Sequence, residues 1–292
     1  MADLRRCRKN LNMPLTPSEQ LQFSTTRIVT KSATGATGSG TGFFATLLKN
    51  GDSQVPVLVT NKHVVQGAVQ GLFRLTTQDA KGEPAIGRTI DLDLGDFEKR
   101  WIPHPDAEVD LAVMPVGPLL TEAAQKGFTV FYKAPSAELI ARPEDLSQLS
   151  AMEELLMIGY PIGLWDQKNN LPIFRRGITA THPAFDFNGK SEFAIDCACF
   201  PGSSGSPVFL FNTGSYYTKN GDTVIGSRLK LLGILYAGPQ YTSEGKIVVK
   251  DVPTAQTAIP VSSSPINLGY VVKAHRLLEF EPIIEAMLKK NG

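Results

Sequence analysis

A serine flanked by glycines interrupts the apolar runs in the second half of the chain. The segment FPGSSGSPV (200–208) is rich in Gly, Pro and Ser and has apolar residues on both sides. Glycines beside a serine let the backbone turn tightly, so that neighbouring N–H groups can converge on one point. An acyl-transfer enzyme needs such a loop, because it requires a hydroxyl nucleophile next to two donors for the oxyanion. A plain Gly/Ser turn has the same composition, so this segment alone leaves both interpretations open.

A serine hydroxyl is inert without a base, and the chain contains four histidines. His63 follows the apolar run VLVTN at a point where a second short apolar segment begins, so its ring is expected at the edge of a packed core. His104 lies between two prolines, His182 precedes a proline, and His275 begins the last amphipathic segment. A surface or turn position is expected for these three, which makes His63 the candidate base.

The base needs an acid that orients it, and Asp110 is the candidate. It precedes the strongly apolar run LAVMPV, where a carboxylate is costly unless it has a partner. Glu108 and Asp106 lie in the preceding polar loop and are expected to be solvated. The chain order His63, Asp110, Ser204 is one of the known orders of a Ser-His-Asp triad.

The elements that must position these residues are mostly short strands. Apolar runs of strand length are separated by Gly, Asn, Asp and Ser, which is typical of a β-barrel or sandwich. The expected strands lie at 26–31, 40–48, 55–61, 71–77, 88–94 and 109–116, then at 155–161, 173–181, 192–200, 206–211, 229–237, 246–252 and 268–274. A proline-containing connector with a few helical turns is expected between the two series, a hairpin tip at Asn220-Gly221, and an amphipathic helix at 275–290.

The composition excludes several classes of protein. The formal net charge is +1 over 292 residues, so a general nucleic-acid binder is not expected. No apolar run is long enough to cross a bilayer and the N-terminus lacks the apolar stretch of a secretory signal. The three cysteines, Cys7, Cys197 and Cys199, form neither a disulfide framework nor a zinc-binding pattern. A cytoplasmic protein without a metal or cofactor is therefore expected.

Taken together, these segments resemble the trypsin-like (chymotrypsin-fold) serine proteases, and most of all bacterial ones of the high-temperature-requirement type. The resemblance lies in GSGTGFF (38–44), LVTNKHVV (58–65), VDLAVMPV (109–116), IGYPIG (158–163), RRGITAT (175–181), GSSGSP (202–207), LLGILYAG (231–238) and NLGYVV (267–272). It implies an all-β fold of two six-stranded antiparallel β-barrels followed by a C-terminal α-helix. The implied units are an N-terminal arm (1–20), a peptidase domain (21–273) with barrels at about 21–120 and 155–273 and a connector at 121–154, and a C-terminal helix (274–292).

The resemblance also assigns roles to individual residues. It implies a serine endopeptidase in which Ser204 is the nucleophile, His63 the general base and then acid, and Asp110 the orienting carboxylate. The N–H groups of Gly202 and Ser204 would form the oxyanion hole. The specificity pocket would have Ala198 at its base and Cys199 and the strand Tyr236, Ala237 and Gly238 as its walls.

The implied pocket favours an apolar residue on the acyl side of the cut, because a buried cationic side chain would need a carboxylate that Ala198 does not supply. Asp196 lies two residues upstream, and a shift in strand register would bring it toward the pocket and favour a basic residue instead. Tyr236 is bulky at a position where the family usually has a small residue, so its side chain would narrow the entrance of the pocket.

The sequence departs from secreted trypsins just before the nucleophile. Ser203 stands where those enzymes have an aspartate that pairs with a newly freed N-terminus. The segment Arg27-Ile28-Val29 looks like a zymogen cleavage point, but without an acid at 203 we interpret it as part of an ordinary first strand. Ser206 replaces the usual glycine, as in some bacterial and viral members. No C-terminal peptide-binding domain is expected after the second barrel.

Two other functions are compatible with parts of this sequence. One is a catalytically silent protease-like module that binds extended peptides, which the complete His/Asp/Ser set disfavours. The other is an esterase, because GSSGS fits the Gly-x-Ser-x-Gly pattern of the α/β-hydrolases, but their triad order differs and a strand rather than a helix follows Ser204. The expected partner is a protein or peptide substrate, with neither nucleic acid nor membrane involved. An uncontrolled cytoplasmic protease would be hazardous, which leaves room for control by a regulatory protein partner or a ligand, although no residue of the sequence indicates either.

Overall fold

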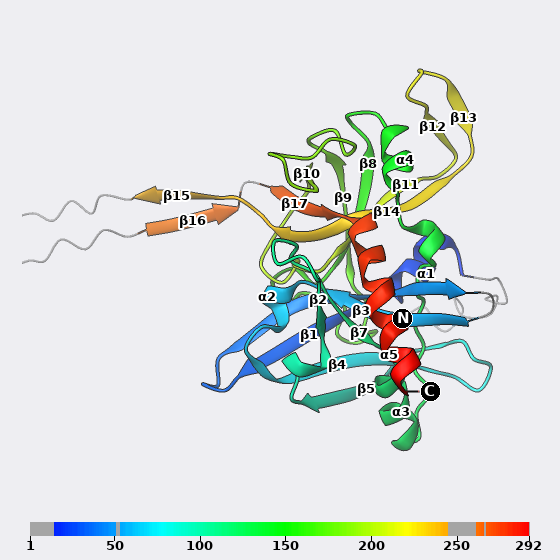
Figure 1. Cartoon of the computed structure of the whole chain (residues 1–292), viewed down its shortest axis with the longest axis vertical. Coiled ribbons are helices and arrows are strands. Elements are labelled where there is room, and N and C mark those ends of the chain that lie inside the picture. The colour runs from blue at the N-terminus through cyan, green and yellow to red at the C-terminus, as the bar shows by residue number, and fades with distance from the viewer. Residues whose placement is uncertain (1–14, 51–52, 245–260, 266, 292) are drawn as a thin grey trace, which may run out of the picture.

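Two β-modules, stacked one above the other, make up most of the computed structural model (Figure 1), which describes residues 15–50, 53–244, 261–265 and 267–291. The N-terminal module contains β1 (Thr25–Ser32), β2 (Thr37–Asn50), β3 (Ser53–Thr60), β4 (Ala68–Gln78), β5 (Pro84–Gly95), β6 (Ile102–Pro103) and β7 (Ala112–Pro115). The C-terminal barrel contains β8 (Glu154–Gly159), β9 (Ile173–Thr179), β10 (Glu192–Asp196), β11 (Pro207–Asn212), β14 (Arg228–Ala237) and β17 (Leu268–Lys273). The predicted fold class, mostly antiparallel β with a C-terminal helix, is confirmed.

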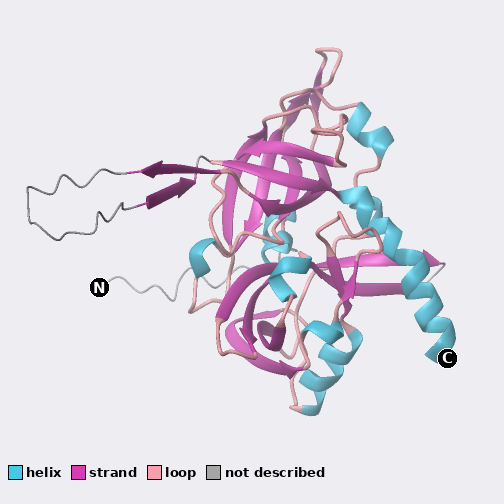
Figure 2. Ribbon diagram, turned by 60° about the vertical axis from the view of Figure 1, so that its left-hand side comes forward, coloured by secondary structure: helices cyan, strands magenta, loops and turns pink. Residues whose placement is uncertain are grey.

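The two modules differ in how their sheets close. The C-terminal barrel closes in the order β10-β17-β14-β11-β8-β9, as expected for six strands. The N-terminal sheet has seven strands in the order β5-β4-β1-β2-β3-β7-β6, and its described residues do not join the two edge strands. The sheet still curves strongly (Figure 2). The edge strand β6 spans only two residues, and Pro103 lacks the N–H that a further ladder would need. The expected first six-stranded barrel is therefore an open, curved seven-stranded sheet.

Alternating side chains explain how these strands form. In β5, Ile90, Leu92 and Leu94 are buried, whereas Asp91 and Asp93 between them are exposed. A period of two places the apolar residues on the concave face of the curved sheet and the carboxylates in water. The same alternation fixes the register with β4, because a slip of one residue would bury both aspartates.

Three apolar clusters hold the molecule together. One fills each module, and the third lies between them. The shared cluster brings together Val59 and Val113 of the N-terminal module, Phe209 and Ile234 of the C-terminal barrel, and Phe280 of the C-terminal segment. All five residues are completely buried. Apolar burial stabilises by roughly 25 cal/mol for each Å² removed from water, so this cluster opposes any separation of the modules.

Short helices connect and cap the strands. They are α1 (Pro17–Gln22), α2 (Lys62–Val65), η2 (Glu98–Arg100), α3 (Gly117–Gln125), η3 (Ala137–Leu139), α4 (Pro143–Ser147), η4 (Pro161–Gly163), η5 (Ala274–Phe280) and α5 (Glu281–Asn291), where η marks a 3₁₀ helix. Helix α1 begins at a capping box formed by Thr16 and Glu19, so the expected arm and peptidase domain meet inside a helix. The predicted helix at 275–290 begins as η5 and becomes α-helical at Glu281, where Pro282 lies in the first turn and needs no N–H donor. No helix in the described part of the chain is long and apolar enough to cross a membrane.

Two hairpins project from the C-terminal barrel. The hairpin of β12 (Ser215–Tyr217) and β13 (Thr223–Ile225) has Asn220-Gly221 in its turn, as predicted. The other pairs β15 (Gln240–Glu244) with β16 (Val261–Pro265). The predicted strand at 246–252 lies outside the described residues.

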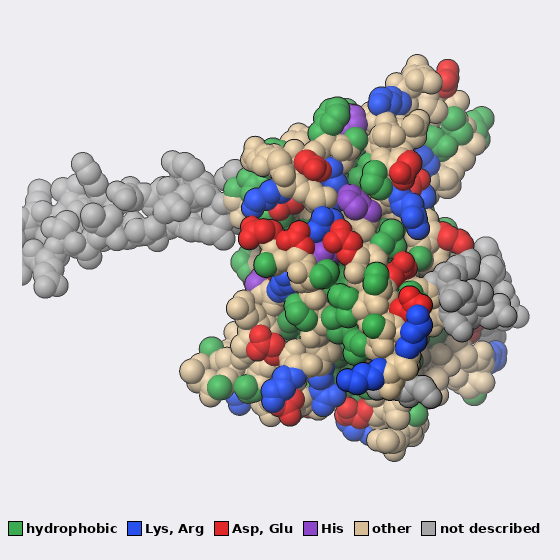
Figure 3. Space-filling view, in the orientation of Figure 1, with side chains coloured by type: hydrophobic (Ala, Val, Ile, Leu, Met, Phe, Trp, Pro, Cys, Tyr) green, Lys and Arg blue, Asp and Glu red, His purple; other side chains and the backbone are tan. Residues whose placement is uncertain are grey.

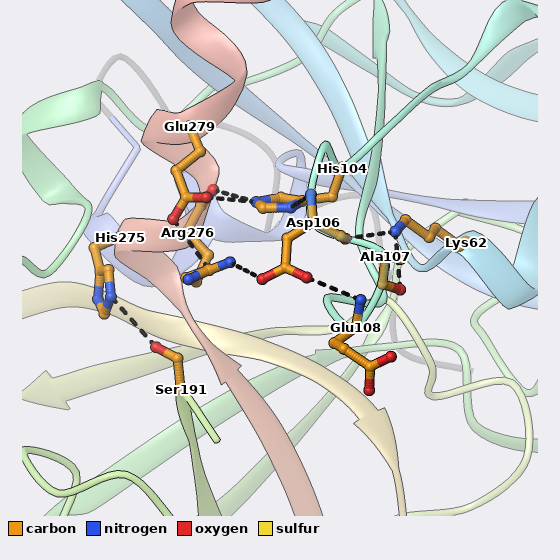
Figure 4. Close-up of polar contacts among 9 residues, drawn as sticks. All are labelled: Lys62, His104, Asp106, Ala107, Glu108, Ser191, His275, Arg276 and Glu279. Carbon is orange, nitrogen blue, oxygen red and sulfur yellow. Dashed lines mark hydrogen bonds and ion pairs between the residues drawn. The ribbon is translucent and has the colours of Figure 1, made fainter. Parts of the chain in front are cut away.

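His104 departs from its expected surface position. It is 3% exposed, because η5 packs over it and places its ring edge-on against Phe280. Its Nε2–H donates to the backbone carbonyl of Arg276 at 3.0 Å, with Glu279 Oε2 at 3.5 Å, and its Nδ1 accepts from the Asp106 N–H at 3.1 Å (Figure 4). Arg276 in turn forms an ion pair of 2.7 Å with the Asp106 carboxylate, so Asp106 is not merely solvated. His104 joins the C-terminal helix to the loop 104–110.

The other two histidines are closer to expectation. His182 lies in a turn and accepts from the Ala184 N–H at 3.2 Å. His275 is half-buried at the start of η5, with its Nε2 3.4 Å from Ser191 Oγ.

The burial of His104 predicts a loss of stability in acid. Burial lowers the pKa of His104 below its ordinary value of 6.5, against the opposing effects of the Arg276 carbonyl and Glu279. The unfolded chain therefore binds more protons than the folded one below about pH 6.5, and stability falls as the pH drops through that value. We expect the free energy of unfolding, measured by urea denaturation, to decrease from about pH 7.5 to about pH 5.

The variant His104→Gln keeps a donor for the Arg276 carbonyl but cannot take up a proton. It should be less stable at neutral pH by about 1 kcal/mol, and its stability should depend less on pH. His275 keeps part of the slope, because burial also lowers its pKa. Equal slopes for the wild type and the variant would contradict the prediction.

Candidate active site

His63 and Asp110 form a close pair at the top of the N-terminal module. His63 lies in α2, directly after β3, and Asp110 lies just before β7. The Nδ1 atom of His63 is 2.5 Å from Asp110 Oδ2, and the His63 backbone N–H donates to Oδ1 at 3.1 Å. A carboxylate only accepts, so Nδ1 carries the proton and Nε2 is left as the basic nitrogen. The His63 side chain is 46% exposed, which leaves that nitrogen open to a second reactant.

The residues before the histidine also hold the loop that carries Asp110. Asn61 Nδ2 donates to the Asp110 carbonyl at 2.7 Å. Lys62 Nζ donates to the carbonyls of Asp106 and Ala107, at 2.8 and 3.3 Å (Figure 4). Three consecutive residues therefore fix one loop, and the carboxylate cannot move without breaking several hydrogen bonds. Sequence reasoning missed the roles of Asn61 and Lys62, although both belong to the quoted LVTNKHVV.

The loop around Ser204 requires its glycines. Gly202 and Gly205 both have φ of +86°, a left-handed conformation that other residues rarely adopt. A Cβ atom at Gly202 would lie 2.7 Å from the Tyr160 carbonyl oxygen, and one at Gly205 would overlap the Thr41 carbonyl oxygen. The glycines of GSSGS thus allow the loop to pack closely against two other segments.

The loop presents two unused amides beside a hydroxyl. The N–H groups of Gly202 and Ser204 donate to no other described residue. The Ser204 hydroxyl donates to the Tyr236 carbonyl at 3.4 Å, and no hydrogen bond between the described residues joins it to His63. Catalytic hydrogen bonds are often long or unformed without substrate. Two convergent amides next to a hydroxyl can bind an oxyanion.

Thr41 of β2 connects this loop to the strand that precedes His63. Its N–H donates to the Ser204 carbonyl at 2.8 Å and its Oγ1 to the Gly202 carbonyl at 3.0 Å. Its own carbonyl accepts from Thr60 Oγ1 at 2.8 Å, and both threonines are completely buried. Because Thr60 ends β3, three hydrogen bonds link the nucleophile loop of one module to the histidine strand of the other.

A cavity of about 250 Å³ opens beside Ser204. Three of the residues expected to form the specificity pocket, Cys199, Ala237 and Gly238, line it, and Ala198 and Tyr236 do not. Its lining is Cys199, Phe200, Pro201, Ser204, Leu235, Ala237 and Gly238. Asp196 is exposed at the end of β10 and lies outside this lining. Most of the lining residues have apolar side chains, and none of them carries a charge.

The Tyr236 side chain turns away from the cavity. Its hydroxyl donates to Glu192 Oε2 at 2.9 Å, and burial together with Glu192 raises its pKa well above the ordinary value of 10.0. The pairing of β14 with β17 shifts register between Leu235 and Ala237, so Tyr236 lies at a bulge. The bulge explains how a bulky residue occupies this position without filling the cavity.

The face shown in Figure 3 has acidic side chains and histidines gathered where the two modules meet. Among the described residues, no group of His, Cys, Asp or Glu is arranged to hold a metal ion. Cys197 and Cys199 are buried free thiols, and burial raises the pKa of both.

Comparison with solved structures finds matches to several proteases at low sequence identity. An HtrA-type protease, AlgW with a tripeptide, has 17% identity and a TM-score of 0.44, with 90% of this chain and 60% of that chain covered. A mutant of the Tobacco Etch Virus protease has 12% identity and a TM-score of 0.46, with 91% and 80% covered. The Rv3671c protease from M. tuberculosis in its active form has 17% identity and a TM-score of 0.39, with 88% and 78% covered. The chain thus spans about 60% of the length of the HtrA-type protease.

The family comparison is more direct. No curated protein sequence matches the chain. The model of the trypsin-like peptidase domain matches residues 40–216, which include His63, Asp110 and Ser204. Since this match covers more than half of the chain, the protein belongs to the trypsin-like peptidase family.

Proposed function

We propose that the chain hydrolyses peptide bonds through a triad of His63, Asp110 and Ser204 and an acyl-enzyme intermediate. The observation that carries the proposal is the His63–Asp110 pair, with 2.5 Å between Nδ1 and Oδ2, linked through Thr41 to a serine loop with two unused amides. A base with a fixed tautomer, a hydroxyl and an oxyanion site are what acyl transfer requires.

The geometry supports the following course. The Ser204 hydroxyl leaves the Tyr236 carbonyl, and its oxygen attacks the substrate carbonyl carbon while His63 Nε2 takes the proton. The carbonyl oxygen becomes an oxyanion that accepts from the Gly202 and Ser204 N–H groups, and Asp110 stabilises the imidazolium. His63 then gives the proton to the leaving amine as the C–N bond breaks. Water, deprotonated by His63, hydrolyses the resulting Ser204 ester and restores the hydroxyl.

The end of β14 supports binding of an extended substrate. Because Tyr236 lies at a bulge, its backbone is not part of the ladder with β17, and Gly238 beyond it is exposed. An extended peptide can pair with this segment as an added strand. A side chain on the acyl side of the cut would then enter the cavity beside Ser204.

One observation favours a second candidate, a catalytically silent module that binds extended peptides. The Ser204 hydroxyl is bonded to the Tyr236 carbonyl and not to His63. Labelling with a fluorophosphonate separates the two candidates, because only a serine activated by its base reacts. A labelled wild type and an unlabelled Ser204→Ala variant support the protease, and an unlabelled wild type supports the silent module.

The triad predicts large losses of activity. Ser204→Ala and His63→Ala should each lower peptidase activity by roughly 10³-fold or more, because the triad acts as a unit. Asp110→Asn should also be severely impaired, since the amide stabilises the wrong histidine tautomer. Cleavage of casein would be measured with folding checked by circular dichroism. Comparable cleavage by Ser204→Ala would refute the assignment.

The strand position of Arg27 predicts activity without N-terminal processing. Ile28 is completely buried in β1 and pairs with β2 on one side and β4 on the other, so a cut after Arg27 would not release a mobile terminus. Ser203 also offers no carboxylate to such a terminus. Intact mass spectrometry of fluorophosphonate-labelled protein should therefore find residues 1–27 still attached. A labelled population that always begins at Ile28 would exclude this prediction.

The uncharged lining of this cavity predicts the preference on the acyl side of the cut. A small or medium aliphatic side chain should be preferred there, since each buried CH₂ contributes about 0.8 kcal/mol and no described carboxylate lines the cavity for a cation. A positional peptide library gives the measurement. Dominant cleavage after Arg or Lys would overturn the prediction and make Asp196 the specificity residue.

A further inference from the structure

A buried cation lies directly behind the nucleophile loop. Arg175 of β9 donates two hydrogen bonds from its Nη1 atom. One goes to Ser203 Oγ at 2.6 Å and the other to the Ala198 carbonyl at 2.8 Å. Its Nε and Nη2 atoms are buried without a hydrogen-bond partner among the described residues. No carboxylate in the described part of the chain lies within ion-pair distance of it. Arg175 is therefore a buried guanidinium whose hydrogen bonds both go to one loop.

Stability alone does not account for this residue. A buried charge without a counter-ion is costly, and an apolar side chain of similar volume would avoid the cost. Burial lowers the pKa of Arg175, and only the thiols of Cys197 and Cys199 oppose that effect. The free-energy cost of burying this charge is therefore offset only if the two hydrogen bonds of Arg175 have a role that an apolar side chain could not fill.

The two acceptors lie at the two ends of the segment that forms the oxyanion site. Ser203, which is 1% exposed, stands between Gly202 and Ser204, whose amides are the unused donors. Ala198 begins the turn that leads to the cavity wall. One guanidinium nitrogen thus joins both ends of residues 198–203, and a rotation of Ser203 would turn its neighbouring amides as well.

We propose that Arg175 is a positioning residue that holds residues 198–204 in the conformation in which the Gly202 and Ser204 amides stay unpaired next to the Ser204 hydroxyl. This inference rests on the proposed function of Ser204. The Arg175 side chain comes from the folded chain itself, so the loop is held without a new N-terminus.

The test compares two neighbouring arginines on β9. Arg175→Met removes the hydrogen bonds and the charge but keeps most of the volume. Arg176→Met is the matched control, because Arg176 is exposed and pairs with Glu154 at 2.6 Å, outside the loop. We expect Arg175→Met to lower kcat on the order of 10²-fold, as small displacements of catalytic groups do, with little change in KM. The rate of fluorophosphonate labelling should fall in parallel, whereas Arg176→Met should keep the wild-type values.

A second variant changes the acceptor of the hydrogen bond instead of the arginine. It keeps the proposal testable if Arg175→Met does not fold. Ser203→Ala removes one acceptor with little change in volume, and we expect kcat to fall about 10-fold at nearly unchanged KM. Arg175→Lys, which keeps the charge, should recover part of the loss. Suppose that the wild-type protein is labelled and that either Arg175→Met or Ser203→Ala, in folded form, keeps kcat within about twofold of the wild-type value. Such a loss is too small for one hydrogen bond, so the inference would be wrong while the proposed triad would stand. If the wild type is not labelled, the proposed function itself fails.

Discussion

The apolar cluster between the two β-modules sets the distance between the reacting groups. His63 and Asp110 belong to the N-terminal module and Ser204 to the C-terminal barrel, so no local sequence determines their separation. Phe209 and Ile234 pack against Val59 and Val113 in this cluster, and each of these four side chains is completely buried. Close-packed interiors deform little, because even small gaps lose contact energy. The hydrogen bonds of Thr41 then refine the docking within this fixed frame.

The nucleophile loop combines steric freedom with electrostatic restraint. Gly202 and Gly205 allow positive φ and close approach, but glycines also give the unfolded loop more conformations to lose on folding. Something must therefore select one conformation. Backbone contacts to Thr41 act at the front of the loop, and the buried Arg175 acts behind it through Ser203. The Ser203 hydroxyl is a suitable partner for Arg175 of β9, because a guanidinium only donates hydrogen bonds and a hydroxyl oxygen can accept one.

Local patterns in the sequence were sufficient for most strands and for the candidate triad, but not for contacts between distant elements. The alternation in β5 and the turn at Asn220-Gly221 depend on neighbouring residues, so they could be predicted. The burial of His104 depends on η5, which follows about 170 residues later, and two flanking prolines indicated a surface turn instead. The open N-terminal sheet depends on how short β6 is, which the apolar pattern around 102–103 does not reveal.

Arg175 illustrates the same limit at the site. Residues 175 and 176 of RRGITAT are both arginines. The guanidinium of Arg175 is buried against the Ser204 loop, whereas Arg176 is exposed and pairs with Glu154. Strand alternation predicts that the two point to opposite faces, but not which face meets the loop. The sequence around Ser204 therefore indicates the candidate chemistry, and long-range packing decides which other residues restrain the loop.

The loop 104–110 has contacts on two sides, and this links the C-terminal helix to the candidate acid. On one side Asn61, Lys62 and His63 bond to it, and on the other Arg276 pairs with the Asp106 carboxylate at 2.7 Å. Asp110 is therefore held between the histidine segment and η5, a helix that lies about 170 residues away in sequence. Loops are usually the more mobile parts of a fold. A carboxylate that must hold an imidazole in one tautomer needs a loop that does not move. Anchoring this loop from the histidine segment and from η5 resolves that conflict, and it makes the C-terminal helix part of the support of the His63–Asp110 pair.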